Sequence, residues 1–188
     1  MVDLAMHMMD IVQNSIRAGA SNVEITFIEN KTDSSLTFSV KDNGTGMTEE
    51  TVRKISDPFF TSRTTRKVGL GVPFLKMTCE QTGGSLTIQS ELNKGTEITA
   101  VYRTDHPDCL PLGDLAGYLV LLLIANPKMD IKFTYRLGDE KFEISARELG
   151  ENEIDDLNSA GMSAAVKEYI NENLKELFLV RKTESYLC

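Results

Sequence analysis

LTFSVKDNGTGM, residues 36–47, is the stretch that decides the fold of this chain. Apolar side chains at Leu36, Phe38 and Val40 alternate with polar ones, which predicts a strand with one buried face. Asp42 continues the apolar positions, so its carboxylate points toward the expected core. Because an unpaired buried charge is costly, we expect Asp42 to have a dedicated partner. The alternative is a strand that ends in an ordinary Asx-type turn.

A helix is predicted upstream over residues 3–17, where apolar side chains recur at helical spacing between an N-cap at Asp3 and a stop at Gly19. Its second face carries a polar stripe made of His7, Asp10, Asn14 and Arg17. A carboxylate, an amide and a guanidinium are suited to a base, a metal ligand and a phosphate contact. An inert solvated face is the alternative interpretation of this stripe.

The segments after this helix alternate between strand and helix patterns. Residues 23–27 predict a strand that forms a hairpin with the 36–42 strand. The sequence DPFF and the polar stretch TSRTTRK follow, and GLGVPF at 69–74 then opens a helix with Pro73 in its first turn. Two further strands are expected around residues 86–88 and 98–102, after the helix ends at Gly83 and Gly84.

This order of segments resembles the GHKL superfamily of ATP-binding domains, which includes histidine kinases, gyrase-type topoisomerases, mismatch-repair ATPases and one class of heat-shock chaperones. Four segments carry the resemblance, in order: DIVQNSIRAGA, DNGTGM, DPFFTSR and KVGLGVPFLK. Lys67 and Val68 depart from the Gly-Thr often found in the fourth. The resemblance implies an α+β fold, a two-layer α/β sandwich of the Bergerat type whose mixed sheet is mostly antiparallel.

The resemblance also implies a site for ATP and Mg²⁺. Asp42 would accept a hydrogen bond from the adenine amino group, with Thr96 beside it directly or through a water. Asn14 would supply an oxygen to Mg²⁺, and Arg17 would contact a phosphate. Further nucleotide contacts are implied at Gly44, Gly46, Met47, Phe60, Thr61, Ser62, Arg63, Lys67, Gly69, Leu70, Gly71 and Val72. Residues 62–67 would form a lid, and the glycines at 69 and 71 would let backbone amides at a helix N-terminus approach the phosphates.

Asp10 lies four residues before Asn14, where ATP-hydrolysing relatives commonly carry a glutamate that activates water. Its side chain is one methylene shorter, so we expect slow hydrolysis or dependence on a partner. His7 is expected to be a polar residue at the rim of the pocket. The predicted function is therefore a partner-dependent ATP switch or slow ATPase. A kinase acting on another protein, or a nucleotide-binding module without catalysis, are the alternatives.

Only a few residues precede the first of the four segments, and neither His7 nor His106 lies on an expected acceptor hairpin, so autophosphorylation on histidine is not expected. The beginning of the chain is also similar to small stand-alone proteins of anaerobic bacteria encoded near hydrogenase-type genes. That similarity implies a protein partner from redox metabolism.

Composition restricts the other function classes. With 188 residues and a net charge of −8, a general binder of nucleic acid or anionic membranes is not expected. Cys79, Cys109 and Cys188 have neither metal-site nor redox-motif spacing. The longest apolar run, residues 118–125, is too short to span a bilayer. With no signal-peptide pattern at the N-terminus, we expect a cytoplasmic protein.

The sequence divides into an ATP-binding domain, residues 1–104, and a C-terminal α+β region, residues 105–188. In the second part we expect a linker at 106–111, a buried helix at 112–125, a hairpin formed by strands 131–135 and 141–146, and an amphipathic helix around 166–178. These elements could form a small layer against the ATP-binding domain or a dimerisation element that makes a homodimer. The sequence pattern leaves both alternatives open.

Overall fold

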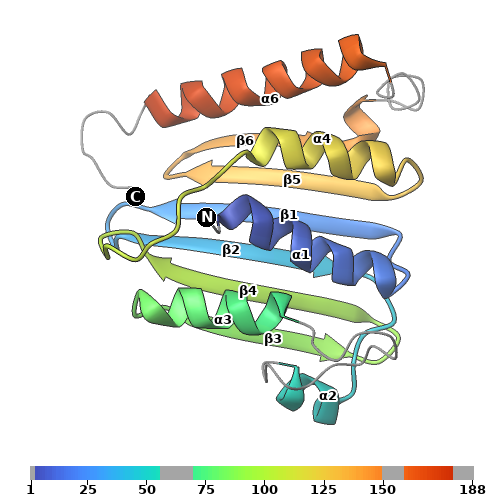
Figure 1. Cartoon of the computed structure of the whole chain (residues 1–188), viewed down its shortest axis with the longest axis vertical. Coiled ribbons are helices and arrows are strands. Elements are labelled where there is room, and N and C mark those ends of the chain that lie inside the picture. Colours follow the sequence, from blue (N-terminus) through green and yellow to red (C-terminus); the bar gives the residue numbers. More distant parts are fainter. Residues whose placement is uncertain (1–2, 56–69, 150–158, 180–188) are drawn as a thin grey trace.

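A computed structural model describes residues 3–55, 70–149 and 159–179 as a six-stranded sheet covered by helices on one face (Figure 1). The strand order is β3-β4-β2-β1-β5-β6. The strands are β1 (Asn22–Asn30), β2 (Ser35–Asp42), β3 (Ser85–Glu91), β4 (Gly95–Arg103), β5 (Asp130–Leu137) and β6 (Glu140–Ser145). The helices are α1 (Leu4–Arg17), α2 (Glu49–Lys54), α3 (Gly71–Gln81), α4 (Leu115–Ala125) and α6 (Ala160–Leu179). The predicted two-layer α+β fold is confirmed.

The β1–β2 hairpin lies at the centre of the sheet, and β2 has the one buried face that the alternation of residues 36–42 predicted. Leu36, Phe38 and Val40 are at most 1% exposed, and their β1 partners point to the same face. Phe27 of β1 stacks on Phe38 with ring centroids 4.8 Å apart. This face is covered by α1, whose own apolar side is buried against it. The core therefore forms between the central hairpin and α1.

The ends of α1 have the signals that the sequence predicted. The Asp3 carboxylate accepts a hydrogen bond from the Met6 amide at 2.8 Å and so caps the N-terminus. The amides of Leu4 and Ala5 have no acceptor within the helix. They donate instead to carbonyl oxygens of the segment that precedes α4, at 3.0 and 2.9 Å. Gly19 has φ of +70° just after the C-cap, where glycine is favoured. The helix is thus fixed at both ends.

The C-terminal half extends the same sheet. Strand β5 lies parallel to β1, whereas the other neighbouring strands are antiparallel. The Phe27 ring also stacks on Tyr135 of β5, with centroids 5.8 Å apart. Helices α4 and α6 cover β5 and β6 on the face where α1 and α3 lie (Figure 1). The division of the chain near residue 104 stays a prediction, while the hydrophobic core continues across that point.

Two details differ from the sequence-based expectations. Helix α4 begins at Leu115 rather than residue 112, because Asp114 accepts from the Gly117 amide and acts as the N-cap. The short helix α2, which begins after an N-cap at Thr48, was not predicted. Within the described ranges, no helix combines the length and apolar character needed to cross a bilayer.

The expected position of His7 at a pocket rim is wrong, because the side chain is buried and only 2% exposed. Its Nε2 lies 3.2 Å from the hydroxyl of Thr78 on α3, and this hydroxyl is 2.9 Å from that of Tyr102 on β4. Burial lowers the pKa of His7 below its ordinary value, although the nearby carboxylates of Asp10 and Asp3 oppose this effect. The predicted helix is confirmed, but α3 packs against this turn of α1 and buries the His7 side chain.

We predict that His7 makes the stability of the fold depend on pH below about 6.5, its ordinary pKa. The native-state pKa is lower than the unfolded one, so as the pH falls the unfolded chain takes up the proton first. Stability is therefore fully present above about pH 6.5 and falls by up to about 1.4 kcal/mol per pH unit until the pH passes the native-state pKa. In His7→Gln this part of the loss should vanish.

The measurement is urea-induced unfolding at pH 7.5 and 5.5. The half-exposed His106 provides the matched control, because His106→Gln removes a histidine that lies outside the core. Losses between the two pH values that are equal in His7→Gln, His106→Gln and the unmodified chain would contradict the prediction.

Candidate functional site

The carboxylate of Asp42, the last residue of β2, is fixed by two hydrogen bonds. The hydroxyl of Ser15 on α1 donates to Oδ2 at 2.7 Å, and the amide of Gly44 donates to Oδ1 at 2.9 Å. The second bond is the expected Asx-type turn, and the first is the expected dedicated partner. Both interpretations of Asp42 therefore hold together. An ionised carboxylate accepts about four hydrogen bonds, so each oxygen keeps a free lone pair.

Two hydroxyl side chains continue a polar row from Asp42 across the sheet. In the strand register Asp42 of β2 pairs with Thr96 of β4, and Thr96 pairs with Ser90 of β3. The Ser90 and Thr96 hydroxyls are 2.8 Å apart. Opposite residues of neighbouring strands point to the same face, so this row faces the helical layer. Thr96 is thus beside Asp42, as predicted.

The loop after Asp42 is packed too closely for side chains at its glycines. A Cβ atom on Gly44 would lie 2.8 Å from the Ala18 side chain, and one on Gly46, which has φ of +62°, would lie 2.0 Å from the Glu91 carbonyl oxygen. The Met47 amide donates to the Ser90 hydroxyl at 2.8 Å. The DNGTGM loop is therefore held against both α1 and the β3–β4 hairpin.

Asp10 of the polar stripe on α1 lies beside the start of α3. Asp10 is exposed, and a Cβ atom on Gly71, the first residue of α3, would lie 3.2 Å from the Asp10 Cβ. Asn14 is half-buried, and its side-chain oxygen accepts a hydrogen bond from the Arg17 guanidinium at 3.0 Å. Asp10 therefore lies at the N-terminus of α3, where backbone amides favour an anion, and Asn14 follows one turn later on α1.

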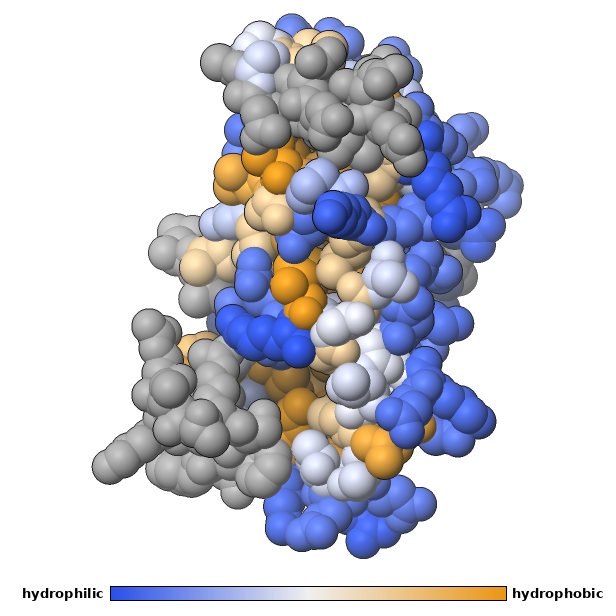
Figure 2. Space-filling view, turned by 90° about the vertical axis from the view of Figure 1, so that its right-hand side faces the viewer, coloured by the Kyte–Doolittle hydropathy of each residue, from blue (hydrophilic) through white to orange (hydrophobic). Residues whose placement is uncertain are grey.

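Figure 1 shows these parts at one side of the molecule, where β2 ends, β4 begins and α1 reaches its C-terminus. Figure 2 looks directly at this side. Hydrophilic residues dominate its right-hand margin, and hydrophobic residues reach the surface along the middle and left.

The donor set suits a magnesium ion that is bound mainly through a ligand. In the part of the chain that the structure describes, no group of three or more His, Cys, Asp or Glu side chains could hold a metal ion. Magnesium prefers hard oxygen ligands, keeps several waters and usually binds through one or two side chains plus phosphates. The side-chain oxygen of Asn14 fits that mode of binding, whereas an all-protein metal cage does not.

Some predicted contacts are not tested by this geometry. Phe60, Thr61, Ser62, Arg63, Lys67 and Gly69, together with the rest of the predicted lid, lie outside the described residues. Leu70 is 40% exposed just before α3, whereas Val72 is buried in the core with 2% of its surface exposed. A nucleotide could therefore contact Val72 only through its backbone. Met47 is half-buried at the end of the loop.

Sequence reasoning missed Ser15 and Ser90, although both contact predicted site residues. Ser15 sits among apolar residues on the buried side of α1, where a serine has no periodic signal. Ser90 alternates with exposed residues of an edge strand, where small polar side chains are common. Ser90 could have been found only from the pairing of the strands, because that pairing places Ser90 opposite Thr96 and Thr96 opposite Asp42 on the same face of the sheet.

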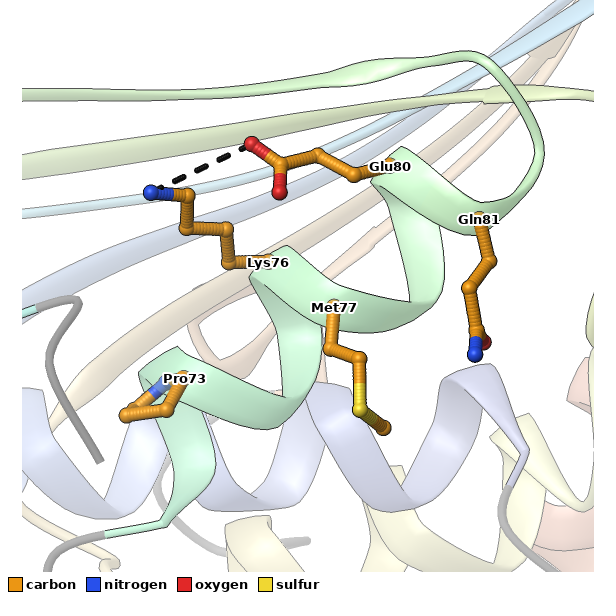
Figure 3. Close-up of a pocket in the computed structure, with 5 residues that line it drawn as sticks. All are labelled: Pro73, Lys76, Met77, Glu80 and Gln81. Carbon is orange, nitrogen blue, oxygen red and sulfur yellow. Dashed lines mark ion pairs between the residues drawn. The ribbon is translucent and has the colours of Figure 1, made fainter.

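A separate hollow of about 460 Å³ lies on the outer surface of α3 (Figure 3). It is lined by Pro73, Lys76, Met77, Glu80 and Gln81. The Lys76 ammonium and the Glu80 carboxylate point toward one another, 4.0 Å apart, while Met77 and Gln81 extend along the other side of the helix. None of the predicted nucleotide contacts lines this hollow, so the candidate site is the polar row and not the hollow.

Comparison with known protein families gives one matching family model. Residues 2–106, more than half of the chain, match the model described as histidine kinase-, DNA gyrase B- and HSP90-like ATPase. The matched range contains α1, the β1–β2 hairpin, α3 and the β3–β4 hairpin. It therefore includes each side chain of the polar row.

Two relatives and one solved structure extend this result. Sporulation kinase C of Bacillus subtilis is 34% identical over 92 residues, which are 49% of this chain and 21% of that protein. Sensor histidine kinase YvrG of the same organism is 29% identical over 98 residues, 50% of this chain and 17% of that protein. The chain thus spans about a fifth of the length of these relatives. The N-terminal domain of a DNA repair protein aligns with a TM-score of 0.53 at 16% identity, covering 77% of this chain and 52% of that one, which shows a shared fold.

We predict that the DNGTGM loop requires glycine at position 46 for two reasons: the positive φ angle of this residue and its close contact with the Glu91 carbonyl. Gly138, in the β5–β6 turn, provides a matched control because its φ of +60° equals that of Gly46 within a few degrees and no atom lies within 4 Å of its added Cβ. Gly138→Ala should cost about 1–2 kcal/mol of backbone strain. Gly46→Ala should cost a further 1–3 kcal/mol or so, because the Cβ overlaps the Glu91 carbonyl.

Urea-induced unfolding of the two variants measures this difference. Equal losses of stability in Gly46→Ala and Gly138→Ala would show that the contact with Glu91 does not constrain the loop.

Proposed function

The chain belongs to the histidine kinase-, DNA gyrase B- and HSP90-like ATPase family, and from this premise we propose that it binds ATP together with Mg²⁺. The observation that supports the proposal is the Asp42 carboxylate, held by Ser15 and Gly44 next to Thr96. Its free lone pairs suit an amino group that donates hydrogen bonds, which adenine carries. The close packing of Gly44 and Gly46 keeps this acceptor in place.

In the proposed complex, Asn14 contributes a side-chain oxygen to Mg²⁺ and Arg17 contacts a phosphate. A bound magnesium ion would neutralise negative charge at the phosphates. In the structure the two side chains bind each other at 3.0 Å. A phosphate would draw the Arg17 guanidinium away and leave the Asn14 oxygen available to the metal. The N-terminus of α3 at Gly71 adds a favourable dipole for negative charge.

Asp10 is the proposed general base for hydrolysis. It is exposed on α1, one turn before Asn14, and lies against Gly71, so it is close to where the phosphates would be. A base acts only within hydrogen-bonding reach of the water it activates. Because aspartate is shorter than glutamate, we propose that hydrolysis is slow in the chain alone and that a protein partner completes the active assembly. A redox-metabolism partner and a homodimer remain predictions from the sequence.

A protein kinase is the second candidate, because the two similar Bacillus subtilis proteins are named as kinases. The acceptor would then be a side chain of another protein. The product of the reaction separates the two functions: radiolabelled phosphate from the γ position appears as free phosphate for an ATPase and on protein for a kinase.

Asp42→Asn should weaken ATP binding by about fivefold to 150-fold. The amide presents a donor where the adenine amino group also donates, and an unsatisfied buried polar group costs about 1–3 kcal/mol. Asp139→Asn, in the exposed β5–β6 turn, makes the same chemical change far from the polar row and should leave affinity unchanged. Calorimetric titration with ATP and Mg²⁺ measures both variants. Undiminished binding by Asp42→Asn would make Asp42 a turn residue and remove the support for the proposal.

Asp10→Glu should raise ATP turnover if the reach of the base limits hydrolysis. The added methylene extends the carboxylate toward the phosphates without changing its charge. Asp139→Glu is the control, and phosphate release under saturating ATP is the measurement. Fast hydrolysis by the unmodified chain, with no gain in Asp10→Glu, would replace the partner-dependent switch by a simple ATPase.

A further inference from the structure

Asp42 and Thr96 are the two groups proposed to face the base. Ser15 contacts the first and Ser90 the second. Ser15 is 2% exposed, and its hydroxyl donates to Asp42, 27 positions away in the sequence. A serine inside a helix usually turns its hydroxyl back to a carbonyl of the preceding turn. Ser15 instead bonds across the layer boundary to the sheet, and this bond restricts rotation of the Asp42 carboxylate.

The hydrogen bonds of Ser90 determine how the Thr96 hydroxyl is oriented. Ser90 Oγ donates its single proton to the Gly95 carbonyl at 2.9 Å and accepts from the Met47 amide at 2.8 Å. A hydroxyl has one proton and two lone pairs. The 2.8 Å contact with Thr96 can therefore be made only if Thr96 donates its proton to Ser90. The Thr96 oxygen then has only lone pairs to offer to a ligand.

The same count of donor protons and acceptor lone pairs applies to Asp42. Its carboxylate is acceptor-only, and the bonds from Ser15 and Gly44 fix which lone pairs remain free. Asp42 and Thr96 occupy paired positions on β2 and β4. Two neighbouring groups thus present acceptors and no donor. A ligand with N–H donors at this point is favoured, and a ligand without them leaves the acceptors unsatisfied.

We propose that Ser15 and Ser90 are positioning residues that keep Asp42 and Thr96 as paired acceptors and thereby select a purine with a 6-amino group. The inference rests on the proposed function, because it concerns how the same site recognises the base. Neither serine touches the ligand itself. Their effect is on selectivity between bases.

The test compares ATP with purine riboside triphosphate, which is ATP without its 6-amino group. Dissociation constants of the full-length chain for both, with Mg²⁺, are measured by calorimetric titration. The unmodified chain should prefer ATP by about tenfold or more, the range expected for hydrogen bonds to a charged acceptor. The ratio of the two constants isolates the amino group, because sugar, phosphates and metal are identical.

Ser15→Ala should lower the preference for ATP by about threefold or more, since the Asp42 carboxylate loses the bond that orients it. Ser90→Ala should do the same, because the Thr96 hydroxyl is freed to point its proton at the amino group. Ser90→Thr keeps a hydroxyl on the strand and should restore the ratio. Ser39→Ala removes a hydroxyl from the opposite face of β2 and should leave the ratio unchanged.

Each outcome bears on a different statement. An unmodified chain that binds neither triphosphate overturns the proposed function, and the inference with it. Binding of ATP with the same ratio in Ser15→Ala, Ser90→Ala and Ser39→Ala overturns the inference and leaves the function intact. A uniform loss of affinity for both triphosphates shows a merely structural role and also overturns it. A reduced ratio that Ser90→Thr restores supports it.

Discussion

A carboxylate on the buried face of a central strand is the constraint on which the site depends. Leu36, Phe38 and Val40 place Asp42 toward the helical layer, and the cost of an unpaired charge there must be offset locally. The Ser15 hydroxyl and the Gly44 amide provide the two bonds that do so. Because one partner belongs to α1 and the other to the loop, the charge also ties these elements to β2.

Local patterns predicted most of the elements, since strand alternation, helical period, caps and glycine turns depend on neighbours in sequence. Long-range contacts decided the rest. The parallel pairing of β5 with β1 carries no local signal, and the burial of His7 depends on where α3 packs. At the site, parity predicted that Asp42 points inward, and the family resemblance implied Thr96 beside it. Ser15 and Ser90 became recognisable only through the hydrogen bonds they make.

The parallel β5 strand changes how the two halves of the chain relate. The sequence pattern left open whether the second half forms an added layer or a dimerisation element. In the structure its aromatic residues pack into the core of the first half. Phe27 of β1 lies 4.8 Å from Phe38, 6.0 Å from Phe133 and 5.8 Å from Tyr135, measured between ring centroids. Burial of such rings contributes strongly to stability. The central hairpin that carries Asp42 is therefore supported by aromatic packing against β5.

In the proposed complex, helix α1 would link recognition of the base to contact with the phosphates. Its first turns are fixed by Asp3 and by the buried His7, so the helix behaves as a rigid support for its last turns. Asn14 and Ser15 are consecutive and hence about 100° apart around the axis. Ser15 therefore points into the sheet at Asp42 while Asn14 points toward the proposed metal. A shift of α1 that weakened the Ser15 bond would also move Asn14, so neither contact can be adjusted independently of the other.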